Sequence, residues 1–254
     1  MRQRYQQLEQ QSQLIQRRLR HSAQEAAQFA QVYDISWIYH ENGLEGCVLT
    51  YPEIRSAVDN QVISDVSLLP TYRDIKAQKF CIDQARERAR DEGVAVDVAW
   101  MVAQHQRLVG DGAQAGCFRR DVPIHRTYFH PIAAPDAIAQ DLAEALSWAG
   151  QGPDFELHPI ELAGRVHHRL MRAFPFSQHS GFLARLVMNL VLLRAGFLPV
   201  IIHAADRQRY YEALRAEEVD FVPFLAEAMA NSQDNALRFV ANLQTGVPRR
   251  AAQS

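Results

Sequence analysis

The chain has 254 residues, 48% of them apolar, and a formal net charge of −2, so one compact core is expected and no global field attracts nucleic acid or an anionic membrane. Three scattered cysteines, Cys47, Cys81 and Cys117, match neither a disulfide framework nor a zinc spacing, which indicates the reducing cytoplasm. The N-terminus lacks the apolar region of a signal peptide, and the longest apolar stretch, 186–202, is too interrupted to span a membrane.

Residues 1–31 have the pattern of a polar helix with a thin apolar stripe, formed by Tyr5, Leu8, Ile15 and Leu19. We expect this N-terminal arm to pack along the surface of the protein; a homodimer formed through it is the alternative. Residues 32–42 continue as helix, and the two glycines within 43–46 predict a break.

Local capping signals predict the next helices. Thr50 and Glu53 have the spacing of a capping box. A further helix is expected from Thr71 to about residue 91, and another between Asp97 as its N-cap and Gly110 as its C-terminal stop. Residues 117–130 alternate in part between apolar and polar side chains, which is typical of a short β-hairpin.

The C-terminal half is expected to be helical. The predicted helices are 135–149, 159–173, 181–195, 206–216 and 221–242, and the helix 181–195 is apolar on nearly every face, as a central buried helix would be. The fold class is therefore all-α with one hairpin. We divide the chain into the arm at 1–31, a helical domain at 32–242 and a disordered tail at 243–254.

One stretch resembles a known family. The loop-and-helix sequence FPFSQHSGFLAR at 174–185, with HPIELA at 158–163 before it and LRAGF at 193–197 after it, resembles the core of the Fic (Fido) family. Residues 37–50 are similar to that family's N-terminal inhibitory helix, and residues 116–119 to the start of its substrate-clamping flap. The resemblance covers about 32–230 and implies a Fic-like helical bundle with a small β-hairpin flap.

The family signature is His-x-Phe-x-Asp/Glu-Gly-Asn-Gly-Arg-x-x-Arg, and members resemble one another in transferring AMP or a related group. The His accepts the proton of the target hydroxyl, and the acidic residue holds Mg²⁺. The Asn and the first Arg contact phosphate oxygens at a helix N-terminus, and the second Arg reaches the outer phosphate. The resemblance therefore identifies the residues on which activity would depend.

Most of these positions differ in this chain. Phe174 stands at the His position and Gln178 at the acidic position. His179 stands at the first Gly position, Ser180 at the Asn position and Phe182 at the first Arg position. The second Gly and the second Arg of the signature are kept, as Gly181 and Arg185. Phe174 and Phe182 would fill the mouth of the pocket or form a new apolar site. His179 is the one candidate base near the loop, whereas His167 and His168 are interpreted as structural.

The inhibitory helix of the family carries a Glu that pairs with the second motif Arg. The matching pair is Glu45 and Arg185, while Glu41 and Cys47 replace the Ser/Thr and Asn of that motif. The pair either fixes helix packing or still gates a ligand. If the fold is right, Glu45 and the seven loop positions should surround one cleft.

These substitutions predict a Fic-like protein without ordinary AMP transfer, which binds or regulates a protein partner. No catalytic residue, metal or cofactor is assigned, and ATP and Mg²⁺ are expected only if the altered loop still binds nucleotide. The alternative is a nucleotidyl- or phospho-group transferase with altered chemistry, in which His179 is the base.

Overall fold

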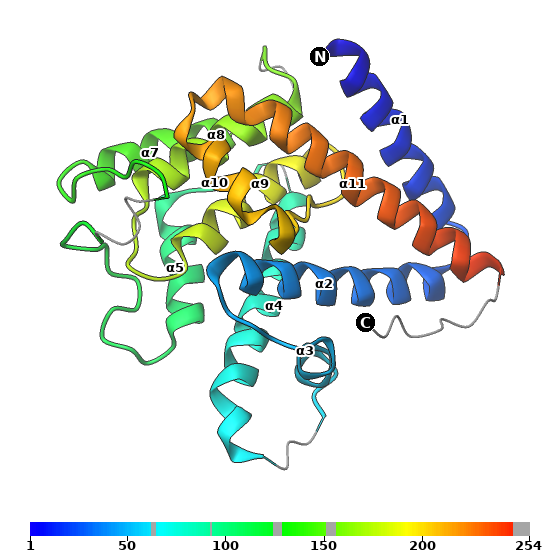
Figure 1. The fold of residues 1–254 in the computed structure, drawn as a ribbon, viewed down its shortest axis with the longest axis horizontal. Coiled ribbons are helices and arrows are strands. Elements are labelled where there is room, and N and C mark those ends of the chain that lie inside the picture. The colour runs from blue at the N-terminus through cyan, green and yellow to red at the C-terminus, as the bar shows by residue number, and fades with distance from the viewer. Residues whose placement is uncertain (62–64, 92, 124–128, 151–155, 246–254) are drawn as a thin grey trace.

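The computed structural model describes residues 1–61, 65–91, 93–123, 129–150 and 156–245, and their regular structure is helical (Figure 1). No strand occurs among these residues, which confirms the all-α class. The helices are α1 (Arg2–Leu19), α2 (Ala23–Glu45), α3 (Tyr51–Val58), α4 (Leu69–Ala89), α5 (Val98–Val109), α7 (Ile138–Ala149), α8 (Pro159–Ala173), α9 (Ser180–Arg194), α10 (Arg207–Arg215) and α11 (Glu218–Thr245), with short 3₁₀ turns at Val66–Leu68 (η1) and Ala204–Asp206 (η2).

Helix α9 is the centre of the molecule. Every residue from Ser180 to Leu192 is buried, as expected for a helix that is apolar on nearly all faces. Helices α8 and α4 pack directly against α9, and α7 and α11 pack against α8. The N-terminus of α9, where the loop 174–179 enters it, is therefore held by surrounding helices.

The N-terminal helices differ from the prediction at one break, at residues 20–22, whereas the break predicted within 43–46 is confirmed at Gly46. The first helix ends at Leu19, and Ser22 caps the second by accepting a hydrogen bond from the N–H of Glu25. The second helix then runs through Gly43 and ends at Gly46, which has the left-handed backbone of a helix C-cap. Gly43 is required for packing, because a Cβ there would lie 2.6 Å from the Cβ of Ala204. The boundary drawn at residue 31 thus falls inside α2.

Helix α1 packs along α11, as the packed-arm interpretation predicts (Figure 1). Tyr5, Leu8 and Ile15 are buried in the same core as the rest of the chain. Gln233 on α11 donates its side-chain N–H to the carbonyl of Leu8 at 3.0 Å. The apolar stripe of α1 is thereby covered within one chain.

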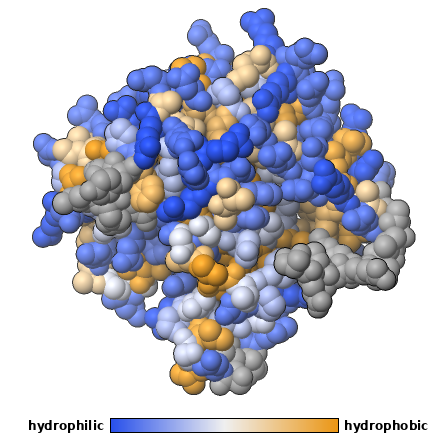
Figure 2. Space-filling model, in the orientation of Figure 1, coloured by the Kyte–Doolittle hydropathy of each residue, from blue (hydrophilic) through white to orange (hydrophobic). Residues whose placement is uncertain are grey.

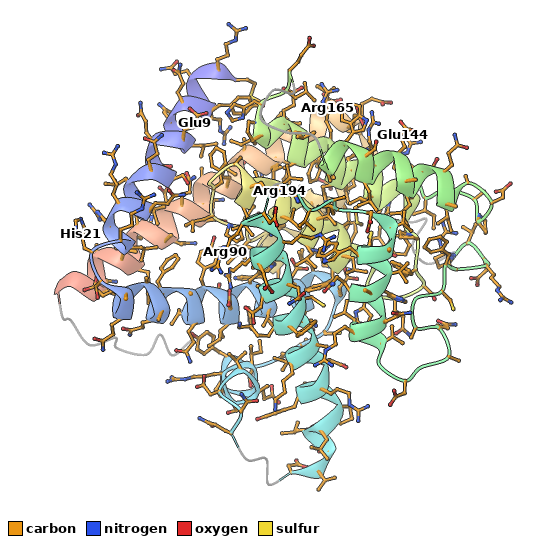
Figure 3. All side chains as sticks on the ribbon, turned by 180° about the vertical axis from the view of Figure 1, so that it is seen from behind. Glu9, His21, Arg90, Glu144, Arg165 and Arg194 are labelled. Carbon is orange, nitrogen blue, oxygen red and sulfur yellow. The ribbon has the colours of Figure 1, made fainter. Side chains whose placement is uncertain are left out.

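A second contact joins α1 to the start of α8. The ring of His158 stacks on Tyr5 with 4.1 Å between centroids. His158 caps α8, because its Nδ1 accepts from the N–H of Ile160, so its Nε2 carries the proton and donates to Glu9 at 3.1 Å. Glu9 lies on α1 (Figure 3). The arm therefore supports the helix that leads to the loop at 174.

The local capping predictions hold. Thr50 and Glu53 form the reciprocal capping box, Asp97 accepts from the N–H of Trp100, and Gly110 ends α5. Pro159 is the first residue of α8. Helices α4 and α7 differ slightly from expectation, since α4 begins at Leu69 and α7 at Ile138 rather than residue 135.

The predicted β-hairpin is not seen in the described residues. Residues 117–123 and 129–130 contain no strand, and residues 124–128 lie outside the described part of the chain. The predicted disordered tail lies outside it from 246 onward, whereas α11 includes residues 243–245. No helix in the described ranges has both the length and the hydropathy that crossing a bilayer requires.

Candidate functional site

The loop between α8 and α9 begins and ends with a left-handed residue that is not glycine. Phe174 has φ 40° and His179 has φ 60°. Such a backbone costs about 1–3 kcal/mol for each residue and persists only where surrounding contacts fix it. Ser180 provides one of these contacts, because its hydroxyl accepts from the N–H of Phe176 and donates to the carbonyl of the same residue, both at 2.8 Å. The turn is thus closed before α9 begins.

A buried arginine holds the first residue of this loop. Arg119 is 4% exposed, and its guanidinium donates to the carbonyls of Phe174 at 2.6 Å and Ala173 at 3.3 Å. Its backbone N–H donates to the carbonyl of Pro175 at 2.9 Å. The last carbonyl groups of a helix lack partners within the helix, so Arg119 satisfies part of the C-terminus of α8.

Helix α5 supports the other side of the loop. The ring of His105 stacks on Phe176 with 3.8 Å between centroids, and its Nδ1 accepts from the N–H of Gly116 at 2.9 Å. The hydroxyl of Ser177 donates to the side-chain oxygen of Gln114 at 2.8 Å. Because Nδ1 of His105 is an acceptor, the neutral imidazole is the form that fits here.

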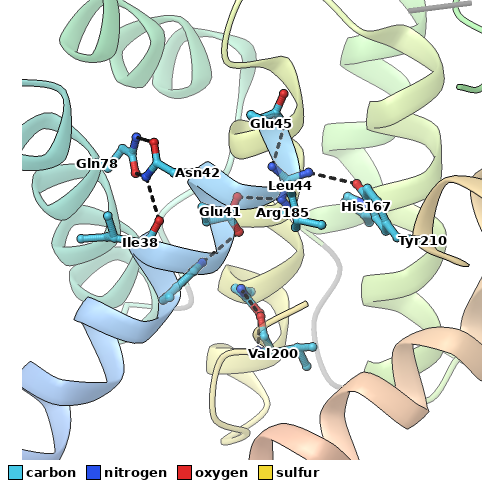
Figure 4. Close-up of polar contacts among 12 residues, drawn as sticks. Ile38, Glu41, Asn42, Leu44, Glu45, Gln78, His167, Arg185, Val200 and Tyr210 are labelled. Atoms are coloured by element: carbon cyan, nitrogen blue, oxygen red, sulfur yellow. Dashed lines mark hydrogen bonds and ion pairs between the residues drawn. The ribbon is translucent and has the colours of Figure 1, made fainter. Parts of the chain in front are cut away.

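Arg185 lies at the centre of the polar contacts in Figure 4. Its Nε donates to Glu41 at 2.7 Å, Nη2 to Glu45 at 2.8 Å, and Nη1 to the hydroxyl of Tyr210 at 3.1 Å. The other carboxylate oxygen of Glu41 accepts from the indole N–H of Trp37 at 3.1 Å. Burial lowers the pKa of Arg185, but the two carboxylates outweigh it and hold the pKa well above its ordinary value. The guanidinium therefore remains charged inside the protein.

Helix geometry explains why two carboxylates reach one arginine. Glu41 and Glu45 are one turn apart on α2, so they project from the same face. Both side chains meet Arg185 in the first half of α9. Glu41 lies deeper, with 5% of its side chain exposed against 22% for Glu45.

Gly181 allows Glu45 to reach the beginning of α9. A Cβ at Gly181 would overlap Oε1 of Glu45, so no other residue fits without displacing the carboxylate. The first N–H groups of a helix have no intrahelical acceptor, and the helix dipole favours an anion there. Glu45 thus places a negative charge where an anionic ligand would otherwise bind.

The structure places the predicted site residues in two groups. Glu45, Gly181 and Arg185 meet, as the resemblance implies. Phe174 and Phe182 are 2% and 3% exposed and belong to the hydrophobic core. Their burial is compatible with rings that fill the mouth of a pocket, and the expectation that all eight positions surround one cleft stays a prediction.

The remaining loop positions differ in their exposure. Ser180 is buried in the turn, Gln178 is exposed, and His179 is partly exposed. Burial lowers the pKa of His179, although Asp74 and Glu45 raise it. His167 and His168 are buried and structural, as expected: Nε2 of His167 bonds the Tyr210 hydroxyl and Nε2 of His168 bonds the Ala216 carbonyl, at 2.9 and 3.0 Å.

Three residues of this site were not identified from the sequence. Glu41 stands at a Ser/Thr position of the family's inhibitory motif, and the sequence signal for its role is its spacing of four from Glu45, which places both on one helix face. Arg119 was noted only at the start of the flap. No local pattern marks Tyr210, because it contacts Arg185 through tertiary packing alone.

Comparison with known proteins agrees with this arrangement. Residues 95–192 match the Fic/DOC family. The chain is 27% identical over 225 residues to protein adenylyltransferase Fic of Culex quinquefasciatus, covering 86% of this chain and 45% of the relative. It is 24% identical over 216 residues to protein adenylyltransferase fic-1 of Caenorhabditis elegans, covering 82% of this chain and 42% of that protein. The chain thus spans less than half the length of these curated relatives.

Solved structures share the fold. A Fic domain containing signaling protein from Bacteroides thetaiotaomicron superposes with a TM-score of 0.80 at 21% identity, over 94% of this chain and 98% of that one. Fic-1 from Caenorhabditis elegans superposes with a TM-score of 0.76 at 22% identity, over 94% and 71%. The protein therefore has the all-α Fic fold. It carries a Fic/DOC-family domain, matched over residues 95–192.

Proposed function

We propose that this protein does not transfer AMP by the histidine mechanism of its family and acts by binding a protein partner. The observation that carries the proposal is Phe174, at the position of the family's general base. Its ring is 2% exposed and packed in the core, and phenylalanine cannot accept a proton. Loss of a general base typically costs about 10²–10⁴-fold in rate.

The phosphate-binding side of the loop supports the same proposal. Phe182 replaces a phosphate-binding arginine and is buried. Gln178, at the Mg²⁺ position, is a neutral amide, whereas Mg²⁺ in proteins is bound mainly through carboxylates and phosphates. The described residues hold no cluster of three or more His, Cys, Asp or Glu that could bind a metal ion. The residues at this position therefore do not fit Mg²⁺.

The proposal extends to the cellular compartment and to cofactors. We propose a cytoplasmic protein with no resident cofactor, which is consistent with three free cysteines, of which Cys47 and Cys117 are exposed. The AMP-transferring activity named for the longer relatives would then belong to those relatives and not to this chain.

His179 favours a second candidate function. It lies at the N-cap of α9, and its lowered pKa keeps the imidazole neutral near pH 7, so it can accept a proton. A nucleotidyl or phospho transferase would use His179 as the base and the first turn of α9 as the phosphate site. The carboxylate of Glu45, which lies against Gly181, opposes such a ligand.

The test combines binding and transfer. ATP binding is measured by calorimetry with and without Mg²⁺, and AMP transfer is measured by intact-mass spectrometry, on the wild type, Glu45→Gly and His179→Ala. We expect no AMP adduct in any of the three. An adduct formed by the wild type or Glu45→Gly and lost when His179→Ala is added would replace the proposal with the altered enzyme.

A further inference from the structure

An exposed stripe on α4 has no role in the site described above. Leu69, Arg73, Lys76 and Phe80 are spaced at i, i+4, i+7 and i+11, so they lie on one face of the helix. All four are exposed, including the two large apolar residues at the ends of the stripe, Leu69 at 51% and Phe80 at 41%. Arg107 of α5 lies over the ring of Phe80 at 4.7 Å. We call these five residues the α4–α5 surface.

This surface borders a groove of about 580 Å³ between α4 and α5. Its lining includes Leu69, Arg73, Lys76 and Arg107, together with Tyr72, Ala77, Gly110 and Asp111. In Figure 2 apolar surface is visible at the lower end of the molecule, where Figure 1 shows α4 beginning. Single exposed apolar residues are ordinary, but here Leu69 lines the groove and Phe80 lies on the same helix face beyond the groove's lining, with cations between the two.

The charge of the groove is unusual for this chain. Three cations and one acid line it, in a protein whose net charge is −2. Within the described residues, Arg73, Lys76 and Arg107 form no ion pair with a carboxylate. By contrast, Arg169 in the groove between α7 and α8 is paired with Glu144, labelled in Figure 3, and with Glu218. The cations of the α4–α5 surface are thus free to pair with acidic groups from outside.

We propose that the α4–α5 surface binds an acidic amphipathic helix of a partner protein. Leu69 and Phe80 are 11 residues apart, or about 16 Å along the helix axis, so the partner helix needs about three turns. Its apolar side chains would contact Leu69 and Phe80, and Asp or Glu between them would face Arg73, Lys76 and Arg107. In helix-in-groove recognition an amphipathic helix places apolar anchors against its partner, and here the three cations would add charge complementarity to two such anchors.

The surface is close to the loop but distinct from it. The segment that follows Gly110 carries Gln114, whose side chain accepts from Ser177 in the loop. A partner on the α4–α5 surface would lie beside the loop without touching Arg185. The inference therefore goes beyond the proposed function and holds whether or not the loop transfers AMP.

The experiment uses a fluorescent helical peptide and measures anisotropy. The acidic peptide has Leu at two positions with the spacing of Leu69 and Phe80. Between them it has Glu at two positions on the same helix face, with the spacing of Arg73 and Lys76. We expect saturable binding that weakens at high salt, as charge pairing requires. The double variant Lys76→Glu/Arg107→Glu should weaken binding at least about tenfold, and Phe80→Ala several-fold.

Matched controls make the result specific. Arg17→Glu/Arg20→Glu reverses two exposed charges on and just after α1 and should leave binding unchanged. A peptide with Lys in place of Glu should not bind. Failure of the acidic peptide to bind below about 1 mM, corresponding to about −4 kcal/mol, would overturn the inference. Equal weakening by the α1 control, or tighter binding to anionic phospholipid vesicles than to the peptide, would also overturn it.

Discussion

Glu41 accepts a hydrogen bond from Nε of Arg185 at 2.7 Å, while Glu45 accepts from Nη2 at 2.8 Å. The resemblance implied only the second of these contacts. Because the two carboxylates bind different nitrogen atoms of the guanidinium, the Glu41 contact does not require Glu45. This second contact determines how the site should respond to mutation.

Arg185→Met should destabilise the protein far more than Glu45→Gln. The first change leaves the Glu41 carboxylate buried without its cation, which costs about 3–5 kcal/mol. The second removes a partly exposed partner and should cost about 1 kcal/mol or less. The free energy of unfolding from urea titration measures both. Adding Glu41→Gln to Arg185→Met should recover part of the loss, and equal losses for the two single variants would contradict this account.

Glu45→Gly alone should not release Arg185 for a phosphate. Glu41 still holds Nε of the guanidinium, so ATP affinity in Glu45→Gly should stay at least about tenfold weaker than in Glu41→Ser/Glu45→Gly, a difference of about 1.4 kcal/mol. Calorimetry with ATP compares the two variants. Glu41→Ser alone is the control, because Glu45 then still lies against the N-terminus of α9. Equal affinity in the single Glu45→Gly and double variants would show that Glu41 plays no part.

Gly181→Ala should destabilise the protein far more when Glu45 is present than when it is absent. The new Cβ overlaps the Glu45 carboxylate, and such overpacking costs about 1–3 kcal/mol. In a Glu45→Gly background that overlap is gone and the nearest atom to the new Cβ is Nη1 of Arg185 at 3.1 Å, while alanine is a better helix former than glycine. A double-mutant cycle on the free energy of unfolding should therefore give a coupling of about 1 kcal/mol or more. Additive effects would mean that the carboxylate is not seated against Gly181.

Acid should destabilise the fold through His105. Burial, and to a lesser extent His179, lowers the pKa of His105 to about 4 in the folded protein. Between pH 6.5 and pH 4 the unfolded chain binds a proton that the folded protein does not, so the stability contributed by His105 is present above pH 6.5 and falls as pH is lowered.

His105→Gln tests this proton directly. The variant should lower stability overall, because the stack on Phe176 is lost, but it should flatten the pH dependence in this window. One proton bound by the unfolded chain and not by the folded protein changes the free energy of unfolding by about 1.4 kcal/mol per pH unit. Urea unfolding at several pH values measures the slope, and an unchanged slope would show that His105 does not titrate with folding.

Local sequence signals predicted much of the fold. The capping box at Thr50, the cap at Asp97, Pro159 and the terminator Gly110 were all correct, because a cap depends on residues within one turn of it. The break predicted within 43–46 was also correct, at Gly46, but the same reasoning does not explain Gly43, which close contact with Ala204 retains inside the helix. That contact joins residues far apart in sequence, so no local pattern contains it.

The sequence by itself determined the all-α class, the buried character of α9 and, through the family resemblance, the pairing of Glu45 with Arg185. Only the tertiary structure decided that Glu41 and Tyr210 also bind Arg185, that Arg119 holds Phe174, and that Phe174 and Phe182 point into the core. The physical reason is that caps and apolar periodicity act within a helix, whereas a buried guanidinium takes its partners from whichever helices the fold packs around it.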